Sequence, residues 1–170
     1  EARALFHRGT VLAWVDSEGS RAASIEGMTL SQRLDDPFLR ASAEGHAVYW
    51  QLHLNGARVA DVRKAEQIVA DARVADDREL LAQSTVVVAL VQIARSDLRA
   101  AAQTAAEGME IGRDIGNAYM CLWCYTMRVG ALLQLGEWGA ALAAIDEGLR
   151  IGAENHFASL LRSQLASLHS

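Results

Sequence analysis

The sequence contains very little proline, cysteine and lysine. Its 170 residues include one proline and two cysteines, and Lys64 is the only lysine among 16 basic residues. So few prolines are untypical of a chain built from loops and strands. Two cysteines cannot form a disulfide framework, so a reducing cytoplasm is the expected location.

Two further absences concern charge and long apolar runs. The net charge of −5 gives an acidic surface and disfavours direct binding of nucleic acid. The longest apolar stretch, Val86 to Val91 with its flanks, is much shorter than the ~20 residues of a membrane-spanning helix. Half of the residues are hydrophobic and many of these are alanine, which favours one helical domain. The chain starts at Glu1 within a helical pattern and without methionine, so we expect a piece of a larger protein.

An internal repeat organises the chain. Residues 26–37, 107–117 and 147–157 resemble one another, and residues 66–77 fit between them with a one-residue slip. The spacing of 40–41 residues predicts four units and a terminal helix. The expected units are residues 1–35, 36–76, 77–116 and 117–155, followed by a helix at 156–169.

Each unit is predicted to be a pair of helices. Asp36, Asp77 and Asn117 occupy one column of the repeat, each directly before an apolar run, and are expected to be N-caps. Pro37 after Asp36 agrees with this prediction, because proline at the first helical position loses no useful hydrogen bond. The expected helices are residues 1–16, 19–34, 37–55, 57–74, 78–95, 97–114, 118–135, 137–153 and 156–169, about nine in all. The fold class is therefore all-α.

The two helices of a unit differ in character. Second helices such as residues 59–75 are amphipathic, with one apolar stripe and charged residues on the opposite face. The first helix at residues 118–135 is apolar nearly all round. A helix of that kind is normally covered on all sides, so we expect first helices to lie between their partners and the neighbouring units.

The fourth copy resembles a tetratricopeptide repeat. In the stretch LLQLGEWGAALAAIDEGLRIG (132–152), Gly136 and Trp138 match the turn glycine and turn aromatic, and Ala141 and Gly148 match the small packing positions. The third copy has Ser96 in place of the glycine, and the period of 40 exceeds the usual 34. This longer form is similar to the superhelical repeat regions of bacterial signalling ATPases and maltose-regulator-type transcription activators. The resemblance implies a right-handed α-solenoid with a recognition groove lined by its first helices.

The resemblance also implies which side chains face that groove. The inward positions carried over column by column are His46, Tyr49, His53, Gln83, Val87, Leu90, Trp123, Met127 and Gln134. Tryptophan, tyrosine and methionine are over-represented at recognition surfaces. The alternative is that these side chains simply pack between units, because a repeat register slips easily by one residue.

Cys121 and Cys124 form a C-x-x-C motif, but the surrounding pattern disfavours redox or metal chemistry. Both lie inside the expected helix after its cap, no strand precedes them, and no second ligand pair follows. Cys124 aligns with Ser84, Ala43 and Ala2, a column of small side chains, so buried packing is expected. His46 and His53 are about 10 Å apart along one helix, too far to share an ion unaided.

No nucleophile, phosphate-loop, zinc or dinucleotide motif occurs in the sequence, so no catalytic residue and no cofactor are expected. The glycines at 108, 112 and 116 alternate with charged residues and indicate close helix packing. We expect a non-catalytic scaffold of a signalling or regulatory protein that binds a protein, a peptide or other domains of its own chain. Two alternatives are a small-molecule effector sensor and a homo-oligomerisation module.

Overall fold

The computed structural model describes residues 1–12, 16–55, 59–74 and 76–154, and these residues are all-helical. They form eight α-helices and no strand: α1 (Ala2–Leu12), α2 (Ser17–Ser31), α3 (Pro37–Asn55), α4 (Val59–Val74), α5 (Arg78–Ala94), α6 (Leu98–Asp114), α7 (Ala118–Gln134) and α8 (Trp138–Glu154). The prediction of paired helices is thus confirmed over this part of the chain. The ninth helix, expected at residues 156–169, lies outside the described residues.

The expected N-caps are confirmed. The backbone N–H groups of Leu39, Leu80 and Met120 donate to side-chain oxygens of Asp36, Asp77 and Asn117 at 3.2, 2.9 and 3.1 Å, in that order. A fourth cap was not predicted. The Asp16 carboxylate accepts from the N–H of Gly19 at 2.9 Å, so α2 begins two residues earlier than expected.

The last four helices are each 17 residues long and are joined by three residues. Their turns place one residue in the left-handed region every 20 positions, namely Asp76 (φ 52°), Ser96 (φ 62°), Gly116 (φ 67°) and Gly136 (φ 75°). The next residue's N–H then donates back to a carbonyl in the last helical turn, as from Asp97 to Gln92 at 2.9 Å. The 40-residue unit is therefore two similar halves of 20 residues.

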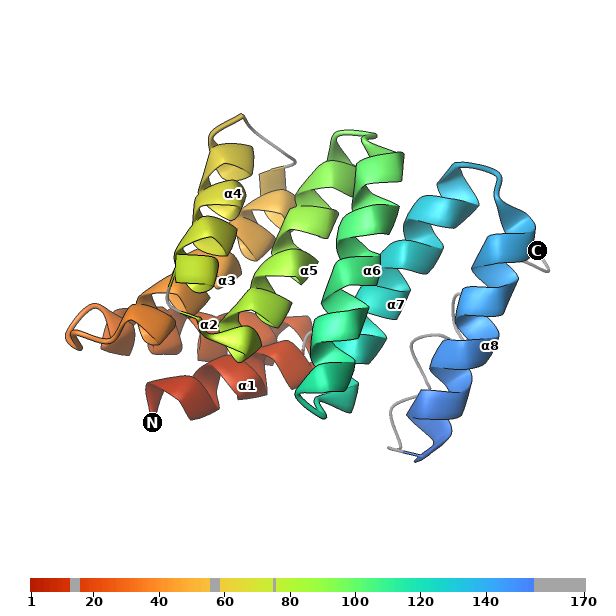
Figure 1. Cartoon of the computed structure of the whole chain (residues 1–170). Coiled ribbons are helices and arrows are strands. Elements are labelled where there is room, and N and C mark those ends of the chain that lie inside the picture. The colour runs from red at the N-terminus through yellow and green to blue at the C-terminus, as the bar shows by residue number, and fades with distance from the viewer. Residues whose placement is uncertain (13–15, 56–58, 75, 155–170) are drawn as a thin grey trace.

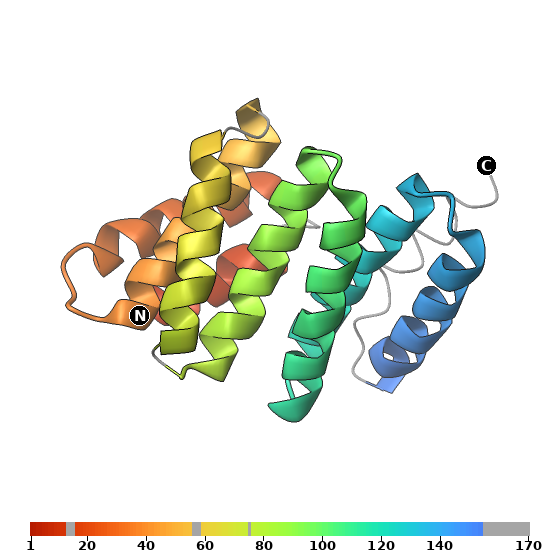
Figure 2. The same ribbon diagram turned by 45° about the horizontal axis from the view of Figure 1, so that its top comes forward.

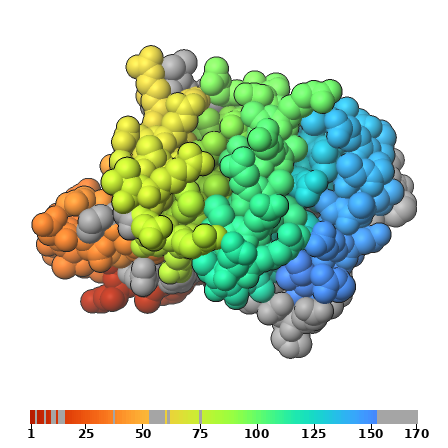
Figure 3. Space-filling model, in the orientation of Figure 1, coloured from red at the N-terminus to blue at the C-terminus, as the bar shows by residue number. Residues whose placement is uncertain are grey.

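Consecutive helices pack against each other in chain order (Figures 1 and 2). The first helix of each pair also contacts the first helix of the next pair, from α1 to α3, α5 and α7. The backbones of the second helices do not approach one another closely in the described residues, but Arg113 of α6 forms an ion pair with Glu147 of α8 at 2.7 Å. The first helices therefore form one continuous layer. Figure 3 shows that side chains fill the spaces between the ribbons from α4 across α5 and α6 to α8.

Helix α7 lies at the centre of the largest core cluster, as its apolar sequence predicted. Every side chain from Met120 to Met127 is buried. Helix α6 buries one stripe only, which consists of Ala101, Ala105, Gly108, Met109 and Gly112. Gly108 and Gly112 let α6 approach closely, because a Cβ at those positions would lie 2.6 Å from Sγ of Cys124 and 2.8 Å from Sγ of Cys121, respectively.

Candidate functional site

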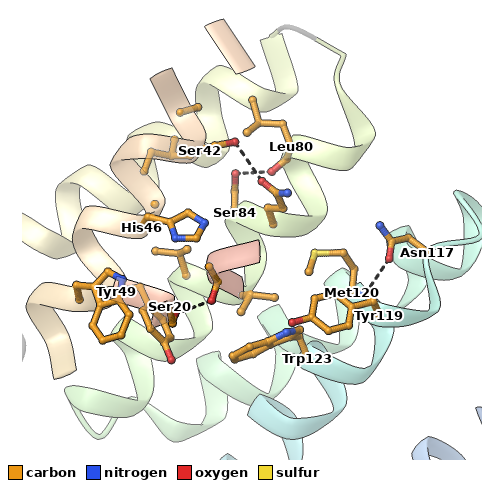
Figure 4. A pocket seen from close by; sticks show the side chains of 18 residues that line it. Ser20, Ser42, His46, Tyr49, Leu80, Ser84, Asn117, Tyr119, Met120 and Trp123 are labelled. Carbon is orange, nitrogen blue, oxygen red and sulfur yellow. Dashed lines mark hydrogen bonds between the residues drawn. The ribbon is translucent and has the colours of Figure 1, made fainter. Parts of the chain in front are cut away.

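A pocket opens in the layer of first helices. Its open volume is about 100 Å³, and α3, α5 and the start of α7 supply most of its wall. Figure 4 shows His46 and Tyr49 of α3 and Tyr119 and Trp123 of α7 among the side chains that line the pocket. The lining residues are Gly9, Ser20, Ala41, Ser42, Gly45, His46, Tyr49, Trp50, Ile68, Leu80, Gln83, Ser84, Val86, Val87, Asn117, Tyr119, Met120 and Trp123.

Aromatic rings from two different units meet at one side of this pocket. The ring centroids of Tyr49 and Trp123 are 6.3 Å apart with nearly perpendicular planes, and Tyr119 stands edge-on to Trp123 at 6.4 Å. Trp50 packs edge-on against Tyr49 at 5.3 Å. Such edge-to-face contacts stabilise a pair by about 0.5–1.5 kcal/mol beyond the burial of their area. The aromatic wall is therefore held in place by contacts among its own rings.

The serine hydroxyls of the pocket are engaged within the protein. Ser20 donates to the carbonyl oxygen of Gly9 at 2.6 Å, and Ser84 donates to that of Leu80 at 2.6 Å. Ser42 donates to Oε1 of Gln83 at 3.3 Å. Because a hydroxyl has one proton, these three groups have no further proton to donate to a ligand. The pocket is consequently less polar than its composition suggests.

His46 connects the pocket to the first unit. The Ser24 hydroxyl lies within hydrogen-bond distance of the carbonyl oxygen of Ser20, at 2.9 Å, and of Nδ1 of His46, at 3.0 Å. The ring also lies 4.9 Å from the ring of Phe6, which joins α3 to α1. This histidine holds three helices together as well as lining the pocket.

The two tyrosines of the pocket are neutral at physiological pH. Burial raises the pKa of Tyr49 above its usual value of 10.0. Burial also raises the pKa of Tyr119 to about 12, and its hydrogen bond with Trp123 opposes this rise. None of the described lining residues is an aspartate, glutamate, lysine or arginine. The pocket is therefore uncharged apart from any charge on His46.

The structure brings five of the nine predicted groove residues to this pocket: His46, Tyr49, Gln83, Val87 and Trp123. Trp123 is only 4 % exposed and forms part of the core as well as the wall. It is therefore a packed ring rather than a side chain projecting freely into a groove.

The remaining predicted residues lie elsewhere. Leu90 packs against the main core cluster and Met127 is buried within it. Gln134 is exposed at the end of α7, where its amide donates to the carbonyl oxygen of Gly130 at 3.3 Å. The rise of 1.5 Å per residue places it about 16 Å beyond Trp123 along the helix axis, too far to share a small pocket. His53 belongs to α3, but its side chain lies outside the described part of the structure.

Sequence reasoning missed Trp50, Tyr119 and Ile68 among the lining residues. Trp50 lies next to the predicted Tyr49, and Tyr119 lies one helical turn before the predicted Trp123. A prediction that had included the neighbouring positions would have found both. Ile68 occupies the repeat column that holds Gly27, Gly108 and Gly148 in the other units. An isoleucine there replaces a glycine that permits close helix packing, which was a signal in the sequence for a local departure from the repeat.

Cys121 and Cys124 are free and buried, and Cys124 fills the small-residue position predicted for it. Burial raises the pKa of Cys124 to about 12. It also raises the pKa of Cys121, against the opposing effect of the Arg113 guanidinium. Both groups are therefore neutral thiols at physiological pH, and a thiol is a poor nucleophile and metal ligand.

The described residues contain no group of three or more histidine, cysteine or acidic side chains placed to hold a metal ion. None of the described helices combines the length and apolar character needed to cross a membrane. The sequence matches no protein-family model and no curated protein.

Proposed function

We propose that the chain is a tetratricopeptide-like α-solenoid that binds a peptide or protein segment through the pocket face of its first helices. The pocket is the observation that carries this proposal, because residues of all four units line it. Close packing between successive first helices, with the second helices α6 and α8 joined by the Arg113–Glu147 ion pair, fits a stack of helix pairs. The domain acts without catalysis, within a larger cytoplasmic signalling or transcription-regulatory protein.

The polar groups of the pocket suit a peptide. Gln83 already accepts from Ser42 through its Oε1, which leaves the amide N–H₂ group to donate to a backbone carbonyl of a bound segment. The apolar wall supplies the burial of surface that stabilises such a complex. Binding of a short segment by a hydrophobic pocket and a few polar groups is a common recognition mode of helical scaffolds.

A second candidate is the sensing of a small-molecule effector. It is favoured by the convergence of four first helices on one small, largely apolar pocket, since a ligand there would contact separate units and would shift their relative positions. Homo-oligomerisation is supported less, by exposed Trp138 and Leu142 on α8.

Selection from a random peptide library on the immobilised chain tests the proposal. We expect peptides whose binding weakens when the pocket is filled by Gly45→Ala. A Cβ at this helical position meets only Cγ2 of Val87, at an ordinary 3.5 Å, so the variant folds. Gly139→Ala is the matched control, because it is also a helical glycine but lies on α8 with nothing within 4 Å. No selected peptide, or peptides equally affected by both variants, would contradict the proposal.

A further inference from the structure

The pocket limits what a bound segment can insert. Its open volume of about 100 Å³ is smaller than a 150 Å³ cavity of the kind that holds benzene. A side chain with four heavy atoms beyond the backbone fits this space better than a phenyl or indole ring. The limit follows from walls that are fixed by the aromatic contacts and by buried Val86 and Met120.

The chemistry of the wall selects against charge. None of the described lining residues is an aspartate, glutamate, lysine or arginine, so an inserted carboxylate or ammonium would lose water without gaining a permanently charged partner. The hydroxyls of Ser20, Ser42 and Ser84 donate within the protein and cannot solvate an anion. The remaining inner surface is formed by hydrocarbon and aromatic groups apart from the side chains of His46, Gln83 and Asn117.

An aromatic cage for a methylated ammonium group is a different possibility, and the geometry disfavours it. The rings of Tyr49, Trp123 and Tyr119 stand edge to face at 6.3 and 6.4 Å, so they contact one another rather than surround a space. A cation needs ring faces within about 6 Å on several sides at once. The described wall also lacks a carboxylate to balance the charge.

From this volume and this lining we propose that the pocket is a socket for one uncharged side chain of leucine or methionine size, presented by a partner peptide. The proposal rests on the peptide-binding function proposed above and names the residue class that anchors the peptide. The leucine or methionine side chain lies against Val87 and the aromatic wall, and the backbone of the peptide lies outside the pocket near Gln83.

The socket can be tested without knowing the partner. The probes are N-acetyl amides of leucine, methionine, glutamate, lysine and tryptophan, added at millimolar concentration to the ¹⁵N-labelled chain. Signals of the Trp50 and Trp123 indole N–H groups report on the wall. We expect the leucine and methionine probes to bind about tenfold or more tightly than the charged probes, since the charged groups would lose hydration without compensation. Gly45→Ala weakens the two apolar probes, and Gly139→Ala leaves them unchanged.

Equal binding of the glutamate or lysine probe, tighter binding of the tryptophan probe, or no shift with any probe would each overturn the socket. Alanine scanning of a selected peptide provides a separate test. One leucine, isoleucine or methionine should dominate its affinity, and a dominant charged residue would refute the socket while leaving peptide binding intact. A selection that yields no peptide would contradict the proposed function, whereas the amide probes still decide whether the socket exists.

Discussion

Tyr49 of α3 and Trp123 of α7 meet edge to face across α5, with ring centroids 6.3 Å apart and planes at 83°. The two helices belong to different, non-adjacent units of the array. Helix α5 contacts both of them, and the backbones of α3 and α7 do not approach closely in the described part of the chain. Side-chain contacts such as this pair of rings therefore link the second unit to the fourth.

The link should be measurable as coupling between the two residues. We expect Tyr49→Leu and Trp123→Leu to destabilise the fold less together than the sum of their separate effects, by about 0.5–1.5 kcal/mol. Urea unfolding followed by circular dichroism gives the four free energies of the cycle. Tyr49→Leu combined with Trp138→Leu is the control. Trp138 is 57 % exposed on α8, so the effects of these two substitutions on the free energy of unfolding should add. Strict additivity of Tyr49 and Trp123 would show that the contact contributes nothing.

The helices were predictable because their signals are local. Asp77 and Asn117 lie directly before apolar runs, and each accepts the hydrogen bond expected of a cap. Helix α2 was the exception: it ends at Ser31, three residues before the predicted end. The turn that follows is closed by the N–H of Leu34, which donates to the carbonyl oxygen of Ser31 at 3.2 Å.

The pocket was predictable only in part, because it depends on how units pack. Column matching placed His46, Tyr49 and Trp123 on the first-helix face, and all three line the pocket. It could not show that Trp123 is buried, because that depends on how neighbouring helices pack on α7. The distance of Gln134 from Trp123, by contrast, follows from the rise per residue along one helix and could have been foreseen.

Gly108 provides a test of the close packing between α6 and α7. In Gly108→Ala the new Cβ would collide with Oγ1 of Thr85 and lie 2.6 Å from Sγ of Cys124. We expect a loss of about 1–3 kcal/mol in the free energy of unfolding. Gly139→Ala should instead stabilise α8 by about 0.5–1 kcal/mol, since it removes a helical glycine without any contact.

The collision of the new methyl group with Thr85 can be distinguished from any general effect of alanine on the stability of α6. Adding Thr85→Ala removes the hydroxyl that the new methyl group meets first. The double variant should therefore recover part of the loss in urea unfolding. If Thr85→Ala and Gly108→Ala were instead additive, the collision would not be the reason for the destabilisation.

Ser96 occupies the left-handed turn position that glycine holds at Gly116 and Gly136. A side chain in this region costs about 1–2 kcal/mol, which glycine avoids at some entropic cost in the unfolded chain. We expect Ser96→Gly to stabilise the protein by about 0.5–1 kcal/mol, measured as a higher midpoint of thermal unfolding. Ser96→Ala keeps a Cβ and should give no such gain, so an equal rise in both variants would exclude backbone strain as the cause.

The buried thiol of Cys124 predicts a loss of stability in alkaline solution. Its pKa is about 12 in the folded protein, against an ordinary value of 9.0 that applies to the unfolded chain. Below pH 9 the thiol is neutral in both states and its ionisation has no effect on stability. Between pH 9 and 12 only the unfolded chain releases the proton, so the free energy of unfolding falls as the pH rises.

Cys124→Ala isolates this contribution from that of Tyr119 and Tyr125, whose pKa values burial also raises to about 12. Alanine suits the site because Ala43 and Ala2 occupy the same repeat column. Urea unfolding of both proteins should show the parent losing about 2 kcal/mol more than Cys124→Ala between about pH 8 and pH 10.5. Parallel pH profiles would mean that the thiol ionises as easily in the folded protein as in the unfolded chain. That result would contradict its burial against Gly108, since a thiolate cannot be accommodated in a dry contact between two helices without a large cost in free energy.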